Sequence, residues 1–231
     1  MRIIAVIPTF NEENKIVSTI EALESLAEIT EIIVADDDSS DRTVEKALET
    51  KASVIKHAKN LGKGESLNAV LKKLDKTACD GVILADGDLG KSASEFKRLI
   101  DNFEKNKKLL IVAGFGRPQK KGGIGLVKAL ARWAIKRQGG EYVQTPLSGQ
   151  RLFDVELLDK ILPLASGFGV EVDMSIKALK SGFQVKEVET TMTHNETGRD
   201  VASIMHRARQ FRDVFKAVLR SGYSKNSGEL N

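Results

Sequence analysis

Cysteine and aromatic side chains are both scarce in this sequence of 231 residues. Cys79 is the single cysteine, which excludes an intramolecular disulfide and any metal site built from several cysteines. We expect it to be a buried or half-buried thiol. The aromatic residues are 9 Phe, 2 Tyr and 1 Trp, too few for the base-stacking surfaces of proteins that bind single-stranded nucleic acids. We therefore expect no nucleic-acid partner.

Long hydrophobic runs are missing as well. No apolar stretch approaches the roughly 18–20 residues of a membrane-spanning helix, and the longest, around 109–114, is typical of a buried strand. Arg2 is followed at once by strand-like residues, without the apolar core of a signal peptide. The sequence predicts a cytoplasmic protein whose contact with a membrane, if it has one, is peripheral and at the inner face. A net charge of +4 suits an anionic substrate or membrane surface.

The first half of the chain alternates strand and helix patterns. Continuous, largely β-branched runs predict buried strands at 3–7, 32–35, 53–56, 81–85 and 109–113. Apolar residues at helical spacing predict helices near 44–48, 67–74 and 96–103, and one at 13–27 with Asn11 as its N-cap. Repeated β-α-β units with short connections predict an α/β fold, in which a mostly parallel sheet has helices on both faces.

After about residue 117 this rhythm changes. A stretch rich in Gly, Pro and Lys predicts a mobile loop, and the patterns beyond it predict three helices and a strand, in the order loop 118–125, helix 126–137, helix 170–180, strand 184–191 and helix 200–220. We expect one domain over 1–220, with halves at 1–117 and 118–220, and a flexible tail at 221–231. Ligands of such sheets bind at the carboxyl ends of the strands, which singles out the loops 8–12, 36–41 and 86–91.

Asp86-Gly87-Asp88 follows directly on a predicted apolar strand. Two carboxylates two residues apart at a strand end can turn toward one point, and such hard oxygen ligands suit Mg²⁺ or Mn²⁺. Mg²⁺ takes one or two protein carboxylates and completes its shell with water and substrate phosphates. The alternative interpretation is a polar turn, because Asp and Gly both favour turns.

Three further polar features each leave two interpretations open. The acidic run at 36–41 either contacts a nucleobase through Asp36 or Asp37, or is a solvated turn that caps the next helix. Lys63 stands between two glycines at a predicted helix start, where it is either part of an anion site or a solvated loop lysine. His194 follows a predicted strand and is either a metal or phosphate ligand or a surface histidine.

Five motifs occur in a fixed order along the chain. They are Val-Ile-Pro-Thr-Phe-Asn-Glu-Glu at 6–13, Asp-Asp-Asp-Ser-Ser-Asp-Arg-Thr at 36–43, Gly-Lys-Gly at 62–64, Ala-Asp-Gly-Asp-Leu at 85–89 and Ser-Gly-Gln-Arg-Leu-Phe at 148–153. This ordered set resembles family-2 glycosyltransferases of GT-A fold. The resemblance implies a GT-A-type domain that binds a nucleotide-diphosphate sugar in its first half and an acceptor, which the motifs do not identify, in its second half.

The resemblance also implies roles for single residues. The nucleotide pocket would be lined by Pro8, Thr9, Phe10, Glu12, Asp36, Asp37, Lys63, Asp86, Gly87 and Arg117. One aspartate of the 36–37 pair would hold the base. Asp88 would bind the Mg²⁺ or Mn²⁺ cofactor, with Asp86 nearer the ribose or sugar. Two departures stand out: Asp38 replaces the usual glycine, and Gly90 replaces a glutamine common in relatives similar to dolichol-phosphate-mannose synthase.

The second half resembles two kinds of family member. The segment 169–182 is similar to the acceptor side of polyprenyl-phosphate glycosyltransferases, which implies an inverting transfer to a membrane-associated acceptor with Asp173 as the catalytic carboxylate. The segment 146–149, with Glu171 and His194, is similar to glucosyl-3-phosphoglycerate synthases. That likeness implies a soluble, retaining enzyme in which Glu171 takes the catalytic place and His194 binds the metal. We prefer the first interpretation and expect Asp173 to be the more sensitive residue.

The helix predicted at 126–137 bears on the acceptor. It carries Lys128, Arg132 and Lys136 along one stripe, together with apolar residues and Trp133. A basic amphipathic helix with a tryptophan can lie on an anionic membrane surface, which predicts a peripheral membrane contact. The alternative is a helix packed against the sheet with its charged face in water.

These observations predict a metal-dependent glycosyltransferase. Asp88 and the donor diphosphate would share the divalent ion, and Lys63 and Arg117 would help to stabilise the leaving nucleoside diphosphate. A nucleotidyltransferase agrees less well, because the loop at 8–13 is acidic instead of Gly-rich and basic. The alternative outside the enzymes is a non-catalytic module that binds sugar nucleotides, which would need neither Asp173 nor metal-dependent turnover.

Overall fold

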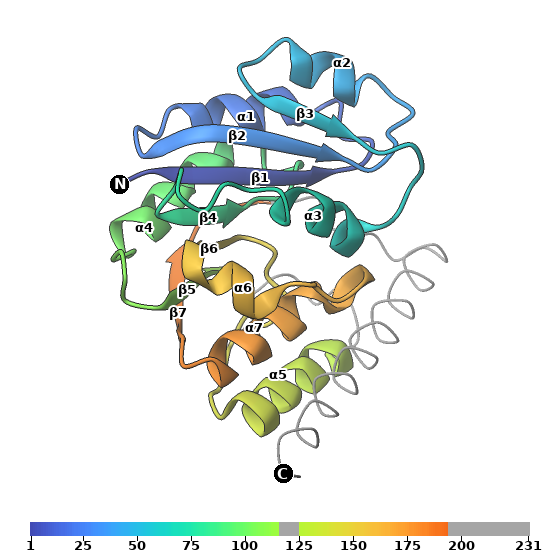
Figure 1. The fold of residues 1–231 in the computed structure, drawn as a ribbon. Helices are drawn as coiled ribbons and strands as arrows, with labels where there is room; N and C mark the ends of the chain where they lie inside the picture. The colour runs from blue at the N-terminus through green and yellow to red at the C-terminus, as the bar shows by residue number, and fades with distance from the viewer. Residues whose placement is uncertain (116–124, 194–231) are drawn as a thin grey trace.

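The protein contains a seven-stranded sheet, seen in a computed structural model that describes residues 1–115 and 125–193 (Figure 1). Its strands are β1 (Ile3–Thr9), β2 (Ile29–Asp36), β3 (Ser53–Lys56), β4 (Gly81–Leu84), β5 (Leu109–Phe115), β6 (Arg151–Asp154) and β7 (Gln184–Thr190). The strand order is β3-β2-β1-β4-β6-β5-β7. All neighbouring pairs are parallel except those of β6, which runs antiparallel to both β4 and β5.

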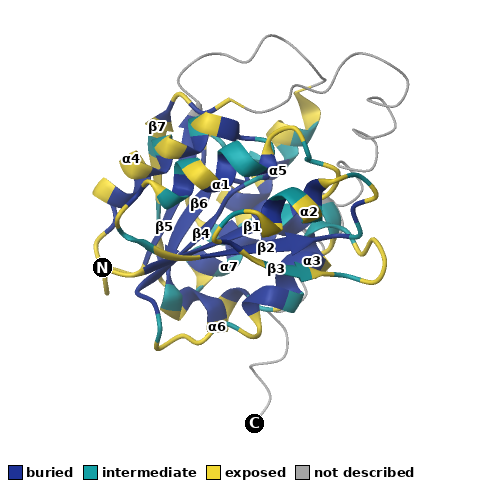
Figure 2. Cartoon of the chain, turned by 90° about the horizontal axis from the view of Figure 1, so that it is seen from above, coloured by how far each residue is buried: buried dark blue, intermediate teal, exposed yellow. Residues whose placement is uncertain are grey.

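Helices cover both faces of the sheet, as the sequence predicts. One face carries α1 (Ile16–Glu24), α2 (Thr43–Leu48) and α4 (Phe96–Asp101), and the other carries α3 (Lys63–Leu71), α6 (Leu158–Ile161) and α7 (Val170–Lys180). The remaining α-helix of the described chain, α5 (Leu126–Gly139), packs on α7 as an outer layer. Figure 2 shows the strands buried between helices whose outer faces are exposed.

Strand β1 shows how one short segment serves two hydrophobic cores. Ile3, Ala5 and Ile7 belong to the cluster that includes α1 and α4, whereas Ile4 and Val6 belong to the cluster that includes α3 and α7. Successive side chains of a strand point to opposite faces. A strand in the centre of a covered sheet is therefore apolar at every position, and this is why the run was recognisable in the sequence.

Several predicted elements are confirmed. The strand at 53–56 and the helix at 170–180 have the predicted bounds, and the mostly parallel sheet is as expected. In the part of the chain that the structure describes, no helix is both long and apolar enough to cross a membrane. The predicted elements that lie outside the described residues are nearly all of the loop at 118–125, the helix at 200–220 and the tail at 221–231.

The start of the first helix was predicted wrongly. Helix α1 begins at Ile16, and Lys15 occupies its N-cap position without a side-chain hydrogen bond. Asn11 has a φ of 56°, and its Oδ1 accepts a hydrogen bond from the backbone N–H of Ser40 at 2.9 Å. Asparagine tolerates this left-handed conformation better than most residues. Asn11 therefore joins the loop after β1 to the loop after β2 instead of capping a helix.

Strand β6 has no counterpart among the predicted elements. It has four residues with a charge at each end, so its apolar pair, Leu152 and Phe153, is too short to show a strand pattern. It nevertheless lies between β4 and β5 and so joins the two halves of the sheet. Because Leu84 pairs with Arg151, the residues just before β6 come to lie beside the loop that follows β4.

Arg151 ties β6 to the preceding turn and to helix α7. It is 1% exposed, and it donates hydrogen bonds to the carbonyl oxygens of Ser148 (2.9 Å) and Pro146 (3.3 Å) and to Ser175 Oγ on α7 (3.0 Å). Burial lowers the pKa of Arg151 to about 10, because the surroundings disfavour its charged form. Hydrogen bonds to all these oxygens offset part of that cost.

Gly64→Ala tests how closely α3 approaches the segment that precedes α7. A Cβ at Gly64 would lie 2.1 Å from the carbonyl oxygen of Ala165, so one backbone segment has to move. We expect the free energy of unfolding in urea to fall by about 1–3 kcal/mol, as for other overpacked sites. Gly114→Ala is the control, since the nearest atom to its Cβ would be 3.6 Å away. Equal losses in both variants would contradict the close approach.

Candidate functional site

The carboxyl ends of β1, β2 and β4 bring the predicted loops together. Thr9 at the end of β1 is paired with Asp36 at the end of β2. A Cβ at Gly87, in the loop after β4, would lie 2.9 Å from Thr9 Oγ1 and 3.4 Å from Glu12 Cγ. The loops after β1 and β4 are therefore in contact, and a side chain at position 87 would push them apart.

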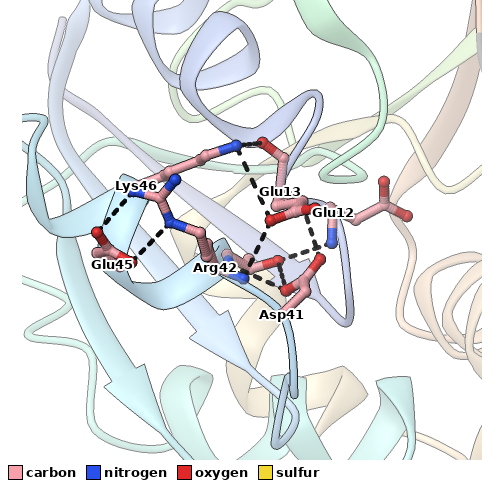
Figure 3. A network of polar contacts seen from close by, with 7 residues as sticks. Glu12, Glu13, Asp41, Arg42, Glu45 and Lys46 are labelled. Carbon is pink, nitrogen blue, oxygen red and sulfur yellow. Dashed lines mark hydrogen bonds and ion pairs between the residues drawn. The ribbon is translucent and has the colours of Figure 1, made fainter.

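The loop after β1 is fixed against α2 on its other side (Figure 3). The backbone N–H of Glu12 donates to Thr43 Oγ1 at 2.8 Å, and that of Glu13 donates to Asp41 Oδ2 at 3.1 Å. Lys46 Nζ donates to the carbonyl oxygen of Glu13 at 2.9 Å. The Glu12 carboxylate points away from this network. The backbone of Glu12 is therefore held in place, while its side chain is directed elsewhere.

Lys63 forms the centre of the site. It is the first residue of α3, and its Nζ lies 2.7 Å from Asp86 Oδ1 and 2.9 Å from Glu171 Oε1 on α7. Burial by itself lowers the pKa of Lys63, but the two carboxylates raise it by more, so the pKa lies above its ordinary value. Lys63 is therefore an ammonium group that connects the two halves of the chain, and the interpretation as a solvated loop lysine is wrong.

Gly149 and Gln150 complete this cluster, although the set of predicted site residues omits them. Gln150 Nε2 donates to Asp86 Oδ2 at 2.6 Å, and the backbone N–H of Asp86 donates to Gln150 Oε1 at 3.0 Å. A Cβ at Gly149 would lie 2.7 Å from both Asp86 Oδ2 and Lys63 Nζ. The motif at 148–153 was a signal for both residues, but their place in the site depends on β6, which the sequence did not predict.

Glu12 lies close to other carboxylates, so its surroundings carry an excess of negative charge. Burial, together with the nearby carboxylates of Asp88, Asp41 and Asp86, raises the pKa of Glu12 to about 7. A divalent cation would offset the excess, and carboxylate oxygens are the ligands that Mg²⁺ and Mn²⁺ prefer. The described residues include no group of three His, Cys, Asp or Glu that could form a metal cage by itself. Mg²⁺ needs only one or two protein carboxylates, so the residues present fit it.

The acidic run at 36–41 is not a solvated turn at its start. Asp36 is 0% exposed and Asp37 is 5% exposed, and both accept hydrogen bonds from backbone N–H groups. Asp36 Oδ2 accepts from Ser39 at 3.0 Å. Asp38, which replaces the usual glycine, has a φ of 67°. The turn thus has the left-handed conformation that glycine favours, although it carries an aspartate.

The residues at the end of β1 that were predicted for the nucleotide pocket lie at the same edge. Pro8 is half-buried, and Thr9 is buried with no hydrogen-bond partner for its Oγ1 among the described residues. Phe10 is 47% exposed, and its ring offers a face on which a base can stack. Arg117 and His194 lie outside the described residues, so their roles stay predictions.

Of the two carboxylates predicted to be catalytic, Glu171 is the one that pairs with Lys63. Glu171 and Asp173 both lie in the first turn of α7 and are buried, and side chains two residues apart on a helix point about 200° apart. Asp173 Oδ2 lies 2.7 Å from Lys177 Nζ, which also donates to the carbonyl oxygen of Ile161. The contacts therefore bring Glu171 into the cluster around Lys63. The preference drawn from the sequence was the reverse, with Asp173 as the catalytic carboxylate.

Comparison with known proteins establishes the family. Residues 4–162 match the family model described as glycosyl transferase family 2. The chain belongs to this family. The uncharacterized protein MJ1222 of Methanocaldococcus jannaschii is 27% identical to this glycosyltransferase over 202 residues, which cover 84% of the chain and 82% of that protein. The prediction of a glycosyltransferase is confirmed.

Solved structures of glucosyl-3-phosphoglycerate synthase from Mycobacterium tuberculosis have the same fold. The complex with Mn²⁺, UDP and glucosyl-3-phosphoglycerate has a TM-score of 0.78 at 26% identity, over 98% of this chain and 82% of that chain. The complex with Mn²⁺, UDP-glucose and glycerol 3-phosphate has a TM-score of 0.76 at 26% identity and the same coverage. A third complex holds Mg²⁺ and UDP. These similarities confirm the GT-A-type fold, and the metals are those predicted from the sequence.

The raised pKa of Glu12 predicts that this glycosyltransferase loses stability as the pH rises. The folded-state pKa of about 7 exceeds the value of 4.5 for a free side chain, so the protonated carboxyl stabilises the fold fully below the lower value and ceases to do so as the pH rises through the upper one. Without metal, we expect Glu12→Gln to raise the Tm at about pH 8 and to change it little at about pH 5.

Glu21→Gln is the control for this measurement, because Glu21 is exposed on α1, away from the site. A gain for Glu12→Gln that is the same at both pH values would contradict the assignment.

Proposed function

We propose that this glycosyltransferase transfers a sugar from a UDP-sugar to a small anionic acceptor, with a phosphoglycerate as the first candidate, and that it uses Mg²⁺ or Mn²⁺. The observation that carries the proposal is the cluster in which Lys63 joins Asp86 of the first half to Glu171 of the second. The similarity to glucosyl-3-phosphoglycerate synthase complexes over 98% of the chain supports the donor and acceptor classes. This acceptor replaces polyprenyl phosphate as the preferred candidate.

On the donor side, the proposal gives separate roles to the charged residues. Asp88 would hold the divalent ion with the donor diphosphate, and the bound ion would supply positive charge as the leaving group becomes more negative. Lys63 supplies a second positive charge at the same edge of the sheet. Asp86 is oriented by its hydrogen bonds to Lys63 and Gln150, which suits the contact with the sugar or ribose that the family resemblance implies.

On the acceptor side, Glu171 is the carboxylate that we propose for catalysis. It belongs to the second half of the chain, yet it lies 2.9 Å from the lysine that would face the donor phosphates. A carboxylate at this junction can accept a hydrogen bond from a hydroxyl of the acceptor or of the transferred sugar. The likeness to glucosyl-3-phosphoglycerate synthases implies that the anomeric configuration is retained.

A membrane-associated acceptor remains the second candidate because of the surface around α5. Leu126, Trp133 and Tyr142 are 61%, 57% and 58% exposed. Arg132 lies over the Tyr142 ring at 5.5 Å, and Lys128 and other basic residues of α5 lie nearby in the sequence. Exposed apolar and basic side chains on one helix suit an anionic membrane surface. The peripheral membrane contact stays a prediction.

Product analysis with two acceptors tests the proposed function. We expect UDP-glucose, Mn²⁺ and 3-phosphoglycerate to yield a glucosylated product with retained configuration, read by nuclear magnetic resonance. Glu171→Gln should reduce kcat by about 10²-fold or more, the range for a positioned catalytic group, and Asp173→Asn should reduce it much less. An inverted product formed only from polyprenyl phosphate in vesicles, with Asp173→Asn the inactive variant, would contradict the proposal. Nucleotide binding without any product would indicate a binding module.

Asp88→Ala tests the metal assignment separately. Asp88 lies in a loop after β4 and outside the apolar cores, so the Tm without ligand should stay nearly unchanged. Calorimetry should show that Mn²⁺ no longer strengthens the binding of UDP, because a metal ligand is lost. The matched control is Asp101→Ala, an exposed aspartate at the end of α4. Undiminished Mn²⁺-dependent binding by Asp88→Ala would rule out Asp88 as the ligand.

A further inference from the structure

Glu187 of β7 holds the segment between α5 and β6. Its Oε2 accepts a hydrogen bond from the backbone N–H of Gln144 at 2.7 Å, and its Oε1 accepts one from the backbone N–H of Thr145 at 2.6 Å. Thr145 Oγ1 also donates to Oε1, at 2.6 Å. Hydrogen bonds to an ionised carboxylate are among the stronger ones in proteins. A single side chain therefore fixes two successive residues that precede it by 43 and 42 positions.

Arg132 of α5 holds the same segment by a carbonyl group. Its Nε and Nη2 donate to the carbonyl oxygen of Gln144 at 3.1 and 2.6 Å, and its guanidinium group lies over the Tyr142 ring. Gln144 thus has its N–H bound to β7 through Glu187 and its carbonyl oxygen bound to α5. We call these contacts of Glu187 and Arg132 the 144–145 clamp. The segment cannot shift without breaking hydrogen bonds of the clamp.

The clamped segment leads into the candidate site through one tight turn. The backbone N–H of Ser148 donates to the carbonyl oxygen of Thr145 at 3.1 Å, which is the hydrogen bond of a β-turn. The next two residues are Gly149, which has no room for a Cβ, and Gln150, which donates to Asp86 Oδ2 at 2.6 Å. Because a hydrogen bond closes the turn, a displacement of Thr145 is passed on to Gln150.

Hydrogen bonds decide where the clamped residues lie, because apolar packing contributes little there. Gln144 is exposed and Thr145 is half-buried, so neither removes much apolar surface from water. On the side of β6, Arg151 holds carbonyl oxygens of the turn itself. The clamp therefore fixes the start of the segment 144–150, and Arg151 fixes its later part.

We infer that Glu187 is a positioning residue for Gln150 and, through it, for Asp86. Glu187 reaches the site by way of the backbone at 144–145, so it governs the geometry of Asp86 without having to touch a ligand. Arg132 shares this role from α5, whether or not that helix also contacts a membrane. The consequence for the donor rests on the proposed function, in which Asp86 contacts its sugar or ribose.

The side-chain amide signal of Gln150 in a heteronuclear NMR spectrum tests the positioning role without any ligand. In Glu187→Gln, an NH₂ group replaces one acceptor oxygen, so at least one N–H group of the segment loses its partner. We expect the Gln150 signal to shift, and we expect the backbone amides of Gln144 and Thr145 to exchange faster with solvent.

Glu189→Gln is the matched control for this measurement. Glu189 is exposed and lies two residues further along β7, on the same face of the strand, so the change of charge is the same. We expect this variant to leave the Gln150 signal in place. An unchanged Gln150 signal in Glu187→Gln, or equal shifts in both variants, would overturn the inference, whether or not the enzyme turns over.

Arg132→Gln releases the other half of the clamp and leaves every carboxylate in place. It removes both hydrogen bonds of the guanidinium group to the carbonyl oxygen of Gln144. We expect the Gln150 signal to shift, as in Glu187→Gln. Lys136→Gln is the control, because it removes an exposed positive charge one turn further along α5. Equal shifts in the two α5 variants would show that charge alone moves the signal and would overturn the inference.

Steady-state kinetics with UDP-glucose and 3-phosphoglycerate tests the consequence for the donor. We expect Glu187→Gln to raise the KM for UDP-glucose about tenfold, as the loss of one hydrogen bond to a charged group predicts, and to leave the KM for 3-phosphoglycerate unchanged. A loss of folded enzyme would instead lower kcat and leave both KM values as they are. In a Gln150→Ala background, the same change should have no further effect.

The outcomes distinguish a failure of the inference from a failure of the proposed function. Unchanged KM values in Glu187→Gln, or a full further effect in the Gln150→Ala background, would show that Glu187 does not act through Gln150 and would overturn the inference. Absence of product from the wild-type enzyme would overturn the proposed function instead, and the NMR measurements would still decide whether Glu187 positions Gln150.

Discussion

The ion pairs of Lys63 with Asp86 and Glu171 are the interactions on which this site depends. They bring together the start of α3, the loop after β4 and the first turn of α7, which belong to different halves of the chain. Without the ammonium group, the like charges of the Asp86 and Glu171 carboxylates would no longer be offset by Lys63 and would repel each other. Under the proposed function, a donor phosphate that engages Lys63 would also alter the surroundings of Glu171. This coupling would give a physical route from donor binding to the acceptor side.

Strand β6 makes this arrangement possible. It runs antiparallel between β4 and β5, and it places Gln150, the residue just before it, against the backbone and side chain of Asp86. The buried Arg151 holds the preceding turn and α7 together through three oxygen acceptors. A single short strand thus sets both the orientation of Asp86 and the position of the helix that carries Glu171. The two halves meet at β6, so the candidate site lies where the sheet changes direction.

The loops of the site were predictable because they follow from the direction of the strands. Parallel strands end at one edge, so the segments 8–12, 36–41 and 86–91 had to meet there whatever their side chains. The contribution of Gln150 was not predictable, because β6 is too short and too charged at its ends to show a strand pattern. The helix spacing indicated that Glu171 and Asp173 face different ways. Which of them faces Lys63 depends on how α7 is rotated against α3.

By itself the sequence determined the α/β sheet, the acidic loops at its carboxyl edge and membership of a glycosyltransferase family. These features are local, since buried strands need continuous apolar runs and turns need particular residues. Only the tertiary structure decided that Lys63 pairs with Glu171 and that Asp37 holds the backbone of Gly62. Residues 63 and 171 are 108 positions apart, and no local pattern encodes such a distance. The packing of α3 and α7 on one face of the sheet brings them together.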